Sequence, residues 1–520
     1  MAKFQQILEK YRKISYSERD KGDRFERLMQ AFLQSYPVYR NELERVWMWN
    51  EFPGRDSLGG NDVGIDIVAR TYSGDYWAIQ CKCYDESAKI DKVAVDTFLS
   101  TSSRSFIDEE GRTQRFSFRL WIDTTRNGFT SNAQEAFVNQ DIQTKRLGYG
   151  ELLSADIDWV ELDKGITGEA VLTNKKTIRP HQQEAIDRAH EYFKIKERGK
   201  LIMACGTGKT FTALKIAERE TEGKGTILFL VPSIALLGQT LREWNYDAEE
   251  RINAVCICSD AEVSKVKRKK DDDTDGFVVS ELAMPASTNV AEIKRQFKAI
   301  KTRREGMTVV FSTYQSIERI AEAQKVIGED AHFDLIVCDE AHRTTGVIEA
   351  MQEESVFVKV HNAEFLIGKR RLYMTATPRI YSESSHTKAA EKDAILCSMD
   401  DPAMYGDEIY RIGFGEAVER QLLSDYKVLV LTLSDDQVSP ELQRSLESKS
   451  SEINVDDAAK LIGCINALSK KTLMDSKMLN ETDPEPMRRA VAFCPTIKLS
   501  KKTSEAFNVC RDVYYNTFSL

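Results

Sequence analysis

The sequence lacks every feature that would direct the protein into a membrane or out of the cell. Its N-terminus has no apolar segment of the kind that a secretory signal needs, and no uninterrupted apolar run reaches the ~18 residues of a membrane-spanning helix. Internal repeats and low-complexity tracts are also absent. We therefore expect a globular protein that stays in the cytoplasm and has no membrane partner.

Paired cysteine motifs are absent as well. None of the ten cysteines forms a C-x-x-C pair, and several lie in apolar, strand-like runs, so we predict reduced thiols. Two C-x-C pairs, at 81–83 and 256–258, could be metal ligands because alternate residues of a strand share one face. Both lie in strand-like sequence (AIQCKCY and AVCICS), which favours packing in a core. No zinc site is predicted.

Positive charge is not in excess either, since the formal net charge is -9. Such a balance is not typical of a nucleic-acid-binding protein. Charges on a protein surface are, however, screened over ~8 Å at physiological salt, so each patch acts locally. The net charge therefore does not exclude nucleic-acid binding within a cleft. Whether the chain binds nucleic acid has to be inferred from its sequence motifs.

With 520 residues the chain is too long for one hydrophobic core, which indicates several domains. Residues 1–165 predict a compact α/β domain. Apolar residues recur at helical spacing between Phe25 and Leu33, and Ser73-Gly74 predicts a hairpin turn between two strands. Strands are predicted over residues 63–70, 75–84 and 116–124.

Residues 166–424 predict a RecA-like doubly wound domain with a parallel sheet. Continuous runs of Val, Ile, Leu and Phe bounded by turns are typical of strands that are buried on both faces. The runs are KLIMA at 200–204, TILFLVPS at 226–233, AVCICS at 254–259, MTVVFSTY at 307–314, FDLIVCDE at 333–340 and RLYMTATP at 371–378. The charged run at 265–275 predicts a solvated loop, and no function is assigned to it.

Residues 425–520 begin what we expect to be a second RecA-like lobe. A strand is predicted at 425–436, and a strand leading into a helix at 488–508. A complete RecA fold needs more strand and helix units than these residues supply. We therefore expect an incomplete second lobe and a polypeptide that continues further or is completed by a partner.

The segment MACGTGKT (203–210) lies between an apolar strand and a helix, which is the context that a phosphate-binding P-loop requires. Glycines let backbone N–H groups close around phosphate oxygens, Lys209 reaches the β and γ phosphates, and the Thr210 hydroxyl coordinates Mg²⁺. Met203 replaces the first glycine of the general pattern. ATP binding is predicted for Gly206, Thr207, Gly208, Lys209 and Thr210.

A DEAH box (339–342) follows the apolar run FDLIVC, which places two carboxylates at the C-terminal edge of the sheet. Asp339 should hold Mg²⁺ through water, and Glu340 should orient and deprotonate the attacking water. His342 completes the box and joins the predicted nucleotide site. A capped helix start at Asp339 could explain this motif alone, but not both motifs together at the ends of strands.

Between about 178 and 380 the chain resembles superfamily 2 helicases. This resemblance implies adenine reading by Gln182 and coupling of the nucleotide site to the nucleic-acid site by Thr375 and Thr377. The matching segments are RPHQQEA at 179–185, VPSIALLGQT at 231–240, STYQS at 312–316 and TATP at 375–378. Short hydroxyl side chains and helix N-termini in the middle two would contact phosphates without reading sequence. Nothing resembles the arginine-bearing motif VI, so the chain alone is expected to hydrolyse ATP poorly.

A second constellation lies in GIDIVARTYSGDYWAIQCK (64–82). It places Asp66 on one strand, and Gln80 and Lys82 on one face of the next. A phosphodiesterase needs an anionic ligand for a divalent metal and a cation to hold the attacking water, which Asp66 and Lys82 supply. A surface pair of Asp66 with Lys82 is the alternative interpretation.

The pattern resembles the Mrr-like branch of the PD-(D/E)xK nucleases, in which a QxK motif replaces the usual second acid. The resemblance adds Gln80 to the catalytic residues and Glu26, on the first helix, as a further carboxylate. Asp62 is a rival ligand. The whole chain resembles the N-terminal nuclease and motor part of the single-polypeptide Type I restriction enzymes, the Type ISP group, in which methyltransferase and target-recognition domains follow.

The sequence thus predicts an ATP-dependent translocase on double-stranded DNA that is joined to a Mg²⁺-dependent endonuclease of a restriction-modification system. Two alternatives stay open. Residues 1–165 could be a DNA-binding module without catalysis, which Mg²⁺-dependent nicking abolished by Asp66→Ala would exclude. The motor could also be an RNA-directed helicase, which would show ATPase activity stimulated by RNA instead of duplex DNA.

Overall fold

The computed structural model describes residues 3–60, 64–137, 140–173, 175–258, 282–303, 305–349, 356–383 and 394–426, with short pieces at 461, 463–465, 467–468, 487, 489–494 and 499–508. The chain divides into two compact units, which are residues 1–270 with 275–424 and residues 271–274 with 425–520. The charged run at 265–275 and, apart from residues 425 and 426, the predicted strand at 425–436 lie outside the described residues. Residues 499–508 are helical as predicted, whereas the described residues 489–494 form no strand.

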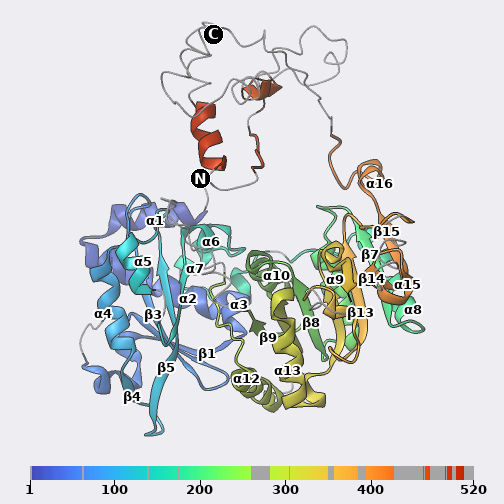
Figure 1. Ribbon diagram of the computed structural model, residues 1–520. Helices are drawn as coiled ribbons and strands as arrows, with labels where there is room; N and C mark the ends of the chain where they lie inside the picture. Colours follow the sequence, from blue (N-terminus) through green and yellow to red (C-terminus); the bar gives the residue numbers. More distant parts are fainter. Residues whose placement is uncertain are drawn as a thin grey trace, which may run out of the picture. The chain divides into compact units, whose positions relative to one another are not determined.

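The N-terminal part of the first unit is built on a mixed six-stranded sheet of order β1-β2-β3-β5-β4, with β6 beside β5 (Figure 1). β2 and β3 pair antiparallel and β3 and β5 pair parallel. The predicted hairpin is confirmed, since β2 and β3 meet across Gly74, whose φ of 87° favours glycine. The strands are β1 Leu43–Met48, β2 Ile67–Thr71, β3 Tyr76–Lys82, β4 Ser105–Ile107, β5 Thr113–Asp123 and β6 Gln143–Leu147.

Helix α2 (Glu18–Ser35) confirms the helical periodicity of this part. It begins at Ser17, whose side chain accepts a hydrogen bond from the Asp20 N–H. Its apolar side chains, Phe25 and Met29 among them, are buried against the sheet. The other helices here are α1 Lys3–Ile14, α3 Pro37–Arg40, α4 Lys92–Ser102, α5 Ser131–Phe137, α6 Tyr149–Ser154 and α7 Trp159–Asp163.

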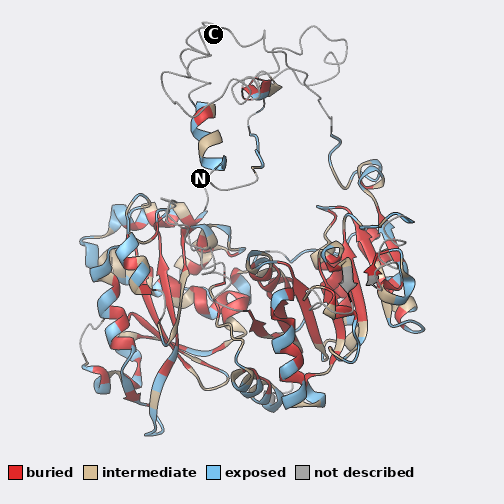
Figure 2. Cartoon of the chain, viewed as in Figure 1, coloured by how far each residue is buried: buried red, intermediate tan, exposed pale blue. Residues whose placement is uncertain are grey.

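A seven-stranded sheet of order β15-β7-β13-β11-β8-β10-β9 forms the second part of this unit, and all of its described pairings are parallel. The six predicted runs are six of its strands. Their residues are buried on both faces (Figure 2), as in β8, where Phe229 and Leu228 belong to different core clusters. The strands are β7 Arg198–Met203, β8 Thr226–Val231, β9 Ile252–Ile257, β10 Met307–Thr313, β11 Phe333–Cys338, β13 Gly368–Thr375 and β15 Asp407–Ile412.

Helices connect these strands and cover the sheet. They are α8 Pro180–Phe193, α9 Lys209–Thr221, α10 Ile234–Asp247, α12 Val290–Arg303, α13 Ile317–Ile327, α15 Pro402–Tyr405 and α16 Phe414–Glu419. A separate antiparallel pair consists of β12 (Gly346–Glu349) and β14 (Ala394–Cys397). The order of strands and helices is that of a RecA-like lobe, and it brings the C-terminal ends of β7, β13, β11 and β8 to one edge of the sheet.

The two sheets share one hydrophobic cluster, which contains Phe32 and Trp77 from the N-terminal part and Trp244 and Met307 from the RecA-like part. The cysteines of both C-x-C pairs belong to this cluster and are buried, as the packing interpretation predicts. Within the described residues, no helix combines the length and the apolar character needed to cross a membrane.

Candidate functional sites

The loop between β7 and α9 has the shape of a phosphate cradle. Gly206 and Gly208 have φ angles of 86° and 89°, which favour glycine. A Cβ atom at Gly208 would meet Nε2 of Gln182, so a larger residue there would displace this side chain from the P-loop. The Thr207 hydroxyl donates to the Ala204 carbonyl over 2.7 Å and closes the loop. Backbone N–H groups at the start of α9 are therefore free to point at an anion, as a nucleotide phosphate requires.

Lys209 and Thr210 occupy the first turn of α9, at the open side of this loop. In the described part of the chain Lys209 makes no ion pair, and its Nζ lies 3.9 Å from Cys205 Sγ. The Thr210 carbonyl accepts a hydrogen bond of 3.1 Å from the indole N–H of Trp244, which fixes this turn against α10. This turn is thus held beside the cradle.

Asp339 and Glu340 follow β11 at the same edge of the sheet. Asp339 is only 7% exposed, and its burial, together with the neighbouring Glu340, raises its pKa to about 6, while Lys209 opposes this shift. The Asp339 carboxylate also accepts a hydrogen bond of 2.9 Å from the Glu340 N–H. Asp339 is thus a buried carboxylate that interacts electrostatically with the P-loop lysine. It is suited to hold a cation next to the phosphates.

A chain of polar contacts links the DEAH box to the TATP segment. Nδ1 of His342 lies 3.3 Å from the Glu340 carboxylate and 3.0 Å from the Thr375 hydroxyl. The Thr375 hydroxyl in turn accepts a hydrogen bond of 3.1 Å from the Thr377 N–H. Burial lowers the pKa of His342, which favours a neutral ring. Glu340 itself has a φ of 49°, in the left-handed region that non-glycine residues rarely adopt.

Gln182 is buried against the P-loop. Its side-chain oxygen accepts from the Arg179 N–H over 2.9 Å, and its amide group donates to the Thr207 carbonyl over 3.3 Å. Both ends of this side chain therefore have backbone partners, and the purine contact stays a prediction. His181 also bonds to the Thr207 carbonyl, which the sequence interpretation missed because it attributed only the glutamine to this motif.

The hydroxyl groups of the STYQS segment are less available than the sequence suggests. Ser312, Thr313 and Ser316 are at most 3% exposed. The Ser312 hydroxyl donates to the Ile257 carbonyl over 2.6 Å, and Thr313 bonds to Ser316 over 3.4 Å. These hydroxyls stabilise the end of β10, so contacts of this segment with a nucleic acid would fall to its backbone or to its neighbours.

In the N-terminal domain the structure brings Asp66, Gln80 and Lys82 together. Asp66 precedes β2, and its Oδ2 accepts hydrogen bonds from the Cys81 N–H at 2.7 Å and from the Gln80 amide group. Lys82 Nζ lies 4.0 Å from the same oxygen. The predicted hairpin therefore brings Gln80 and Lys82 together around the Asp66 carboxylate.

One buried atom of this cluster fits a metal ion. The Gln80 side chain is 1% exposed, and its Oε1 has no hydrogen-bond partner among the described residues. An unsatisfied buried acceptor costs about 1–3 kcal/mol, which a cation bound beside it would offset. Burial raises the pKa of the Cys81 thiol most, followed by the Asp66 carboxylate and then by the Glu26 carboxylate. Glu26, on α2, is therefore close to this cluster. Asp62 lies outside the described residues.

The structure adds a carboxylate that the sequence interpretation did not weigh. Asp123, at the end of β5, pairs in register with Lys82 and is fully buried. Its oxygens are bound by the Arg146 guanidinium at 2.6 and 2.8 Å and by Thr125. Because Asp123 is neutralised in this way, it is not a free metal ligand. The described residues contain no group of three or more His, Cys, Asp or Glu side chains arranged for a metal.

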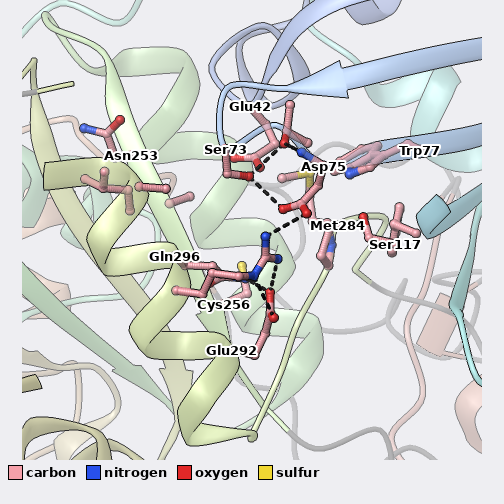
Figure 3. A pocket seen from close by; sticks show the side chains of 17 residues that line it. Glu42, Ser73, Asp75, Trp77, Ser117, Asn253, Cys256, Met284, Glu292 and Gln296 are labelled. Atoms are coloured by element: carbon pink, nitrogen blue, oxygen red, sulfur yellow. Dashed lines mark hydrogen bonds and ion pairs between the residues drawn. The ribbon is translucent and has the colours of Figure 1, made fainter. Parts of the chain in front are cut away.

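The turn of the β2–β3 hairpin is attached to the RecA-like part. Arg295, on α12, pairs with Asp75 over 2.7 Å, and the Ser73 hydroxyl donates to the same carboxylate over 2.8 Å. Figure 3 shows Ser73 and Asp75 of this turn opposite Glu292 of α12. On the other side, the Arg251 guanidinium lies 3.9 Å from the centre of the Tyr72 ring. A cavity with a mixed polar and apolar lining lies beside this contact, between the hairpin and α12. The strands that carry Gln80 and Lys82 are thus fixed at their far end by two arginines of the other domain.

Comparison with known families gives two matches within the chain. Residues 34–169 match the model Mrr_cat_2, which describes a restriction endonuclease, and residues 175–380 match a model for the res subunit of Type III restriction enzymes. A probable helicase of African swine fever virus is 26% identical over 250 residues, which are 48% of this chain and 24% of the viral protein. The Type I restriction enzyme EcoAI endonuclease subunit of Escherichia coli is 24% identical over 344 residues, which are 64% of this chain and 34% of that protein.

Among solved structures, the ATP-dependent Type ISP restriction-modification enzyme LlaBIII bound to DNA is similar over 94% of this chain. The identity is 36%, the TM-score is 0.76, and the match covers 30% of that enzyme. The chain therefore spans about a quarter to a third of the length of the proteins it matches. This structural match includes both the N-terminal domain and the RecA-like lobe.

Proposed function

Because this chain joins an Mrr-like restriction endonuclease domain to a superfamily 2 helicase domain, in the arrangement of the Type ISP enzymes, we propose that it is the nuclease and motor part of a restriction-modification enzyme. The helicase domain implies ATP as its nucleotide. In this proposal the motor hydrolyses ATP to move along double-stranded DNA, and the N-terminal domain cuts that DNA. Methyltransferase and target-recognition domains would follow or associate with the chain.

The observation that carries the nuclease proposal is the convergence of Gln80 and Lys82 on Asp66 around a buried, unsatisfied oxygen. Mg²⁺, when bound, would supply the charge that stabilises the phosphodiester transition state. Asp66 and Gln80 Oε1 would hold it, with Glu26 as a further carboxylate. The Lys82 side chain is 33% exposed, against 10% for Asp66, so its Nζ can hold the attacking water at the solvent side of the cluster.

The motor proposal assigns roles to the P-loop edge of the parallel sheet. Asp339 and Thr210 would hold the Mg²⁺ that accompanies ATP, and Lys209 would neutralise charge on the phosphates. Glu340 accepts a proton from the attacking water. Through His342 the Glu340 carboxylate is connected to Thr375, so a change at the nucleotide can reach the TATP segment.

Cleavage of plasmid DNA by the complete enzyme tests the nuclease proposal. We expect Mg²⁺-dependent and ATP-dependent cutting, which Asp66→Asn and Lys82→Ala abolish. Asp56→Asn and Lys164→Ala are matched controls, because both side chains are exposed and lie outside the cluster. Cutting that survives in the Asp66 and Lys82 variants would leave the domain as a DNA-binding module.

The ATPase activity of the same preparation tests the motor proposal. Double-stranded DNA should stimulate hydrolysis, and RNA of the same length should not. Stimulation by RNA alone would make the protein an RNA-directed helicase instead. Because the nuclease variants leave the P-loop intact, their ATPase activity serves as an internal control for folding.

A further inference from the structure

Two neighbouring side chains of α8 converge on one carbonyl oxygen of the P-loop. His181 Nε2 lies 2.9 Å from the Thr207 oxygen, and Gln182 Nε2 donates to that oxygen over 3.3 Å. The side chains of His181 and Gln182 are 2% and 4% exposed. This carbonyl is therefore held from the helix side by two donors that water does not reach.

The peptide group of Thr207 gives this contact a consequence for the nucleotide. A trans peptide is planar, and its C=O and N–H bonds point in opposite directions. The N–H on the other side of the Thr207 carbonyl belongs to Gly208, so fixing the oxygen against α8 turns the Gly208 N–H toward the inside of the loop. Hydrogen bonds accepted by the carbonyl also polarise the peptide and strengthen its N–H as a donor.

The His181 ring makes its hydrogen bond to the P-loop through Nε2 alone. The second ring nitrogen, Nδ1, is buried and has no hydrogen-bond partner there. A carbonyl oxygen can only accept, so Nε2 must carry the proton and the ring is the Nε2–H tautomer. A phenylalanine at 181 would fill the same space without a donor, whereas a glutamine amide could still reach the oxygen.

We propose that His181 is a positioning residue of the nucleotide site, which orients the Thr207–Gly208 peptide so that the Gly208 N–H binds a phosphate oxygen. Gln182 shares this role. The inference rests on the proposed ATP site and deepens it, because it assigns this motif to the phosphates and not to the purine base.

Displacement of a fluorescent ADP from the complete protein provides the test, with ADP, GDP and inorganic pyrophosphate as competitors. His181→Phe should weaken the binding of ADP and of pyrophosphate by the same factor. We expect about 3- to 10-fold, the range for loss of one hydrogen bond. His181→Gln should bind both within about 2-fold of the wild type. His190→Phe is the matched control, since His190 lies on the same helix but pairs with Glu220.

Several results would overturn the proposal. Unchanged affinity in His181→Phe removes the contact from nucleotide binding. A change in the preference for ADP over GDP, with pyrophosphate unaffected, assigns the motif to the purine. Equal losses of nucleotide affinity in His181→Phe and His181→Gln, with a lowered melting temperature in both, would show that His181 only packs against the loop. If the wild type binds no nucleotide while its DNA cleavage persists, the ATP site and this inference both fail, but the nuclease proposal stands.

Discussion

The Arg295 guanidinium of the helicase domain lies 2.7 Å from the Asp75 carboxylate in the β2–β3 turn of the nuclease domain. The Asp75 and Glu292 carboxylates raise the pKa of Arg295 further above its usual range. The same hairpin carries Gln80 and Lys82 at its other end. This pair is therefore a direct contact between the helicase domain and the strands of the candidate nuclease site.

We expect the pair to be worth little in stability, because Arg295 is 44% exposed. A double-mutant cycle with Arg295→Ala and Asp75→Ala should give a coupling energy of about 0.5–1 kcal/mol at low salt, which falls toward zero in ~1 M salt. The exposed pair Lys164–Glu161, within the nuclease domain, is the comparison. A coupling well above this range would mean that the pair is shielded from solvent.

Lys82→Ala should reduce DNA cleavage by about 10²- to 10⁴-fold, as expected for removal of a group that positions a proton transfer. Mn²⁺ binding should remain detectable by calorimetry, because the metal ligands are intact. Asp66→Ala should abolish cleavage and metal binding, and it also leaves the Cys81 N–H and the Gln80 amide without their acceptor. Asp66→Asn keeps an acceptor and separates chemistry from folding. Cleavage by Lys82→Ala at the wild-type rate would contradict the assignment.

Lys209→Ala should remove nucleotide hydrolysis and leave the fold intact, because Lys209 makes no ion pair in the described residues and lies at the open side of the P-loop. Melting temperature and nucleotide turnover of the variant are the measurements. Lys194→Ala, at an exposed lysine that pairs with Glu191, is the control. Loss of folding in Lys209→Ala would point to a structural role instead.

Glu340→Gln should retain ATP binding and reduce turnover by about 10²-fold or more, because the amide keeps the shape of the side chain but cannot accept the proton. The contact with His342 at 3.3 Å can still form with an amide oxygen. Binding is measured by displacement of a labelled nucleotide, and turnover by phosphate release. Unchanged turnover would exclude Glu340 from the mechanism.

His361 should make stability depend on pH. Burial lowers its pKa to about 4, and both ring nitrogens have partners, the Tyr373 hydroxyl and the Thr344 carbonyl. In the unfolded chain His361 binds a proton below about pH 6.5, whereas in the folded protein it does so only near pH 4. The free energy of unfolding therefore decreases as the pH is lowered from about 6.5 to about 4. The loss approaches about 3 kcal/mol, and above pH ~6.5 this group contributes no pH dependence.

Thermal unfolding between about pH 7.5 and about pH 5 measures this effect. His361→Asn lacks the titrating group, so its melting temperature should fall less steeply with acid than that of the wild type. Parallel curves for the two proteins would show that His361 is not the responsible group.

The sequence predicted the helicase sheet well because its strands are buried on both faces, which leaves continuous apolar runs. It missed β15, whose sequence DEIYRI places exposed charges on an edge strand. It also missed β1 (Leu43–Met48), in which Glu44 and Arg45 are exposed. Strands at the edge of a sheet have only part of their surface buried, so their apolar pattern is weak.

The candidate sites were predictable where they depend on spacing and not where they depend on packing. The period of a strand puts Gln80 and Lys82 on one face, and the hairpin turn brings Asp66 beside them. By contrast, the bond from His181 to the Thr207 carbonyl joins residues 26 positions apart and depends on how α8 packs on the loop. The neutralisation of Asp123 by Arg146 likewise depends on the parallel pairing of β5 and β6.

The left-handed backbone of Glu340, with its φ of 49°, sets a limit on how this protein can be improved. A non-glycine residue held in such a conformation costs on the order of 1–3 kcal/mol, and the surrounding structure must sustain it. Selection for thermal resistance alone would favour glycine at this position and so discard the carboxylate that we propose as the base in ATP hydrolysis. Engineering for robustness therefore has to leave position 340 unchanged and seek its gains elsewhere in the chain.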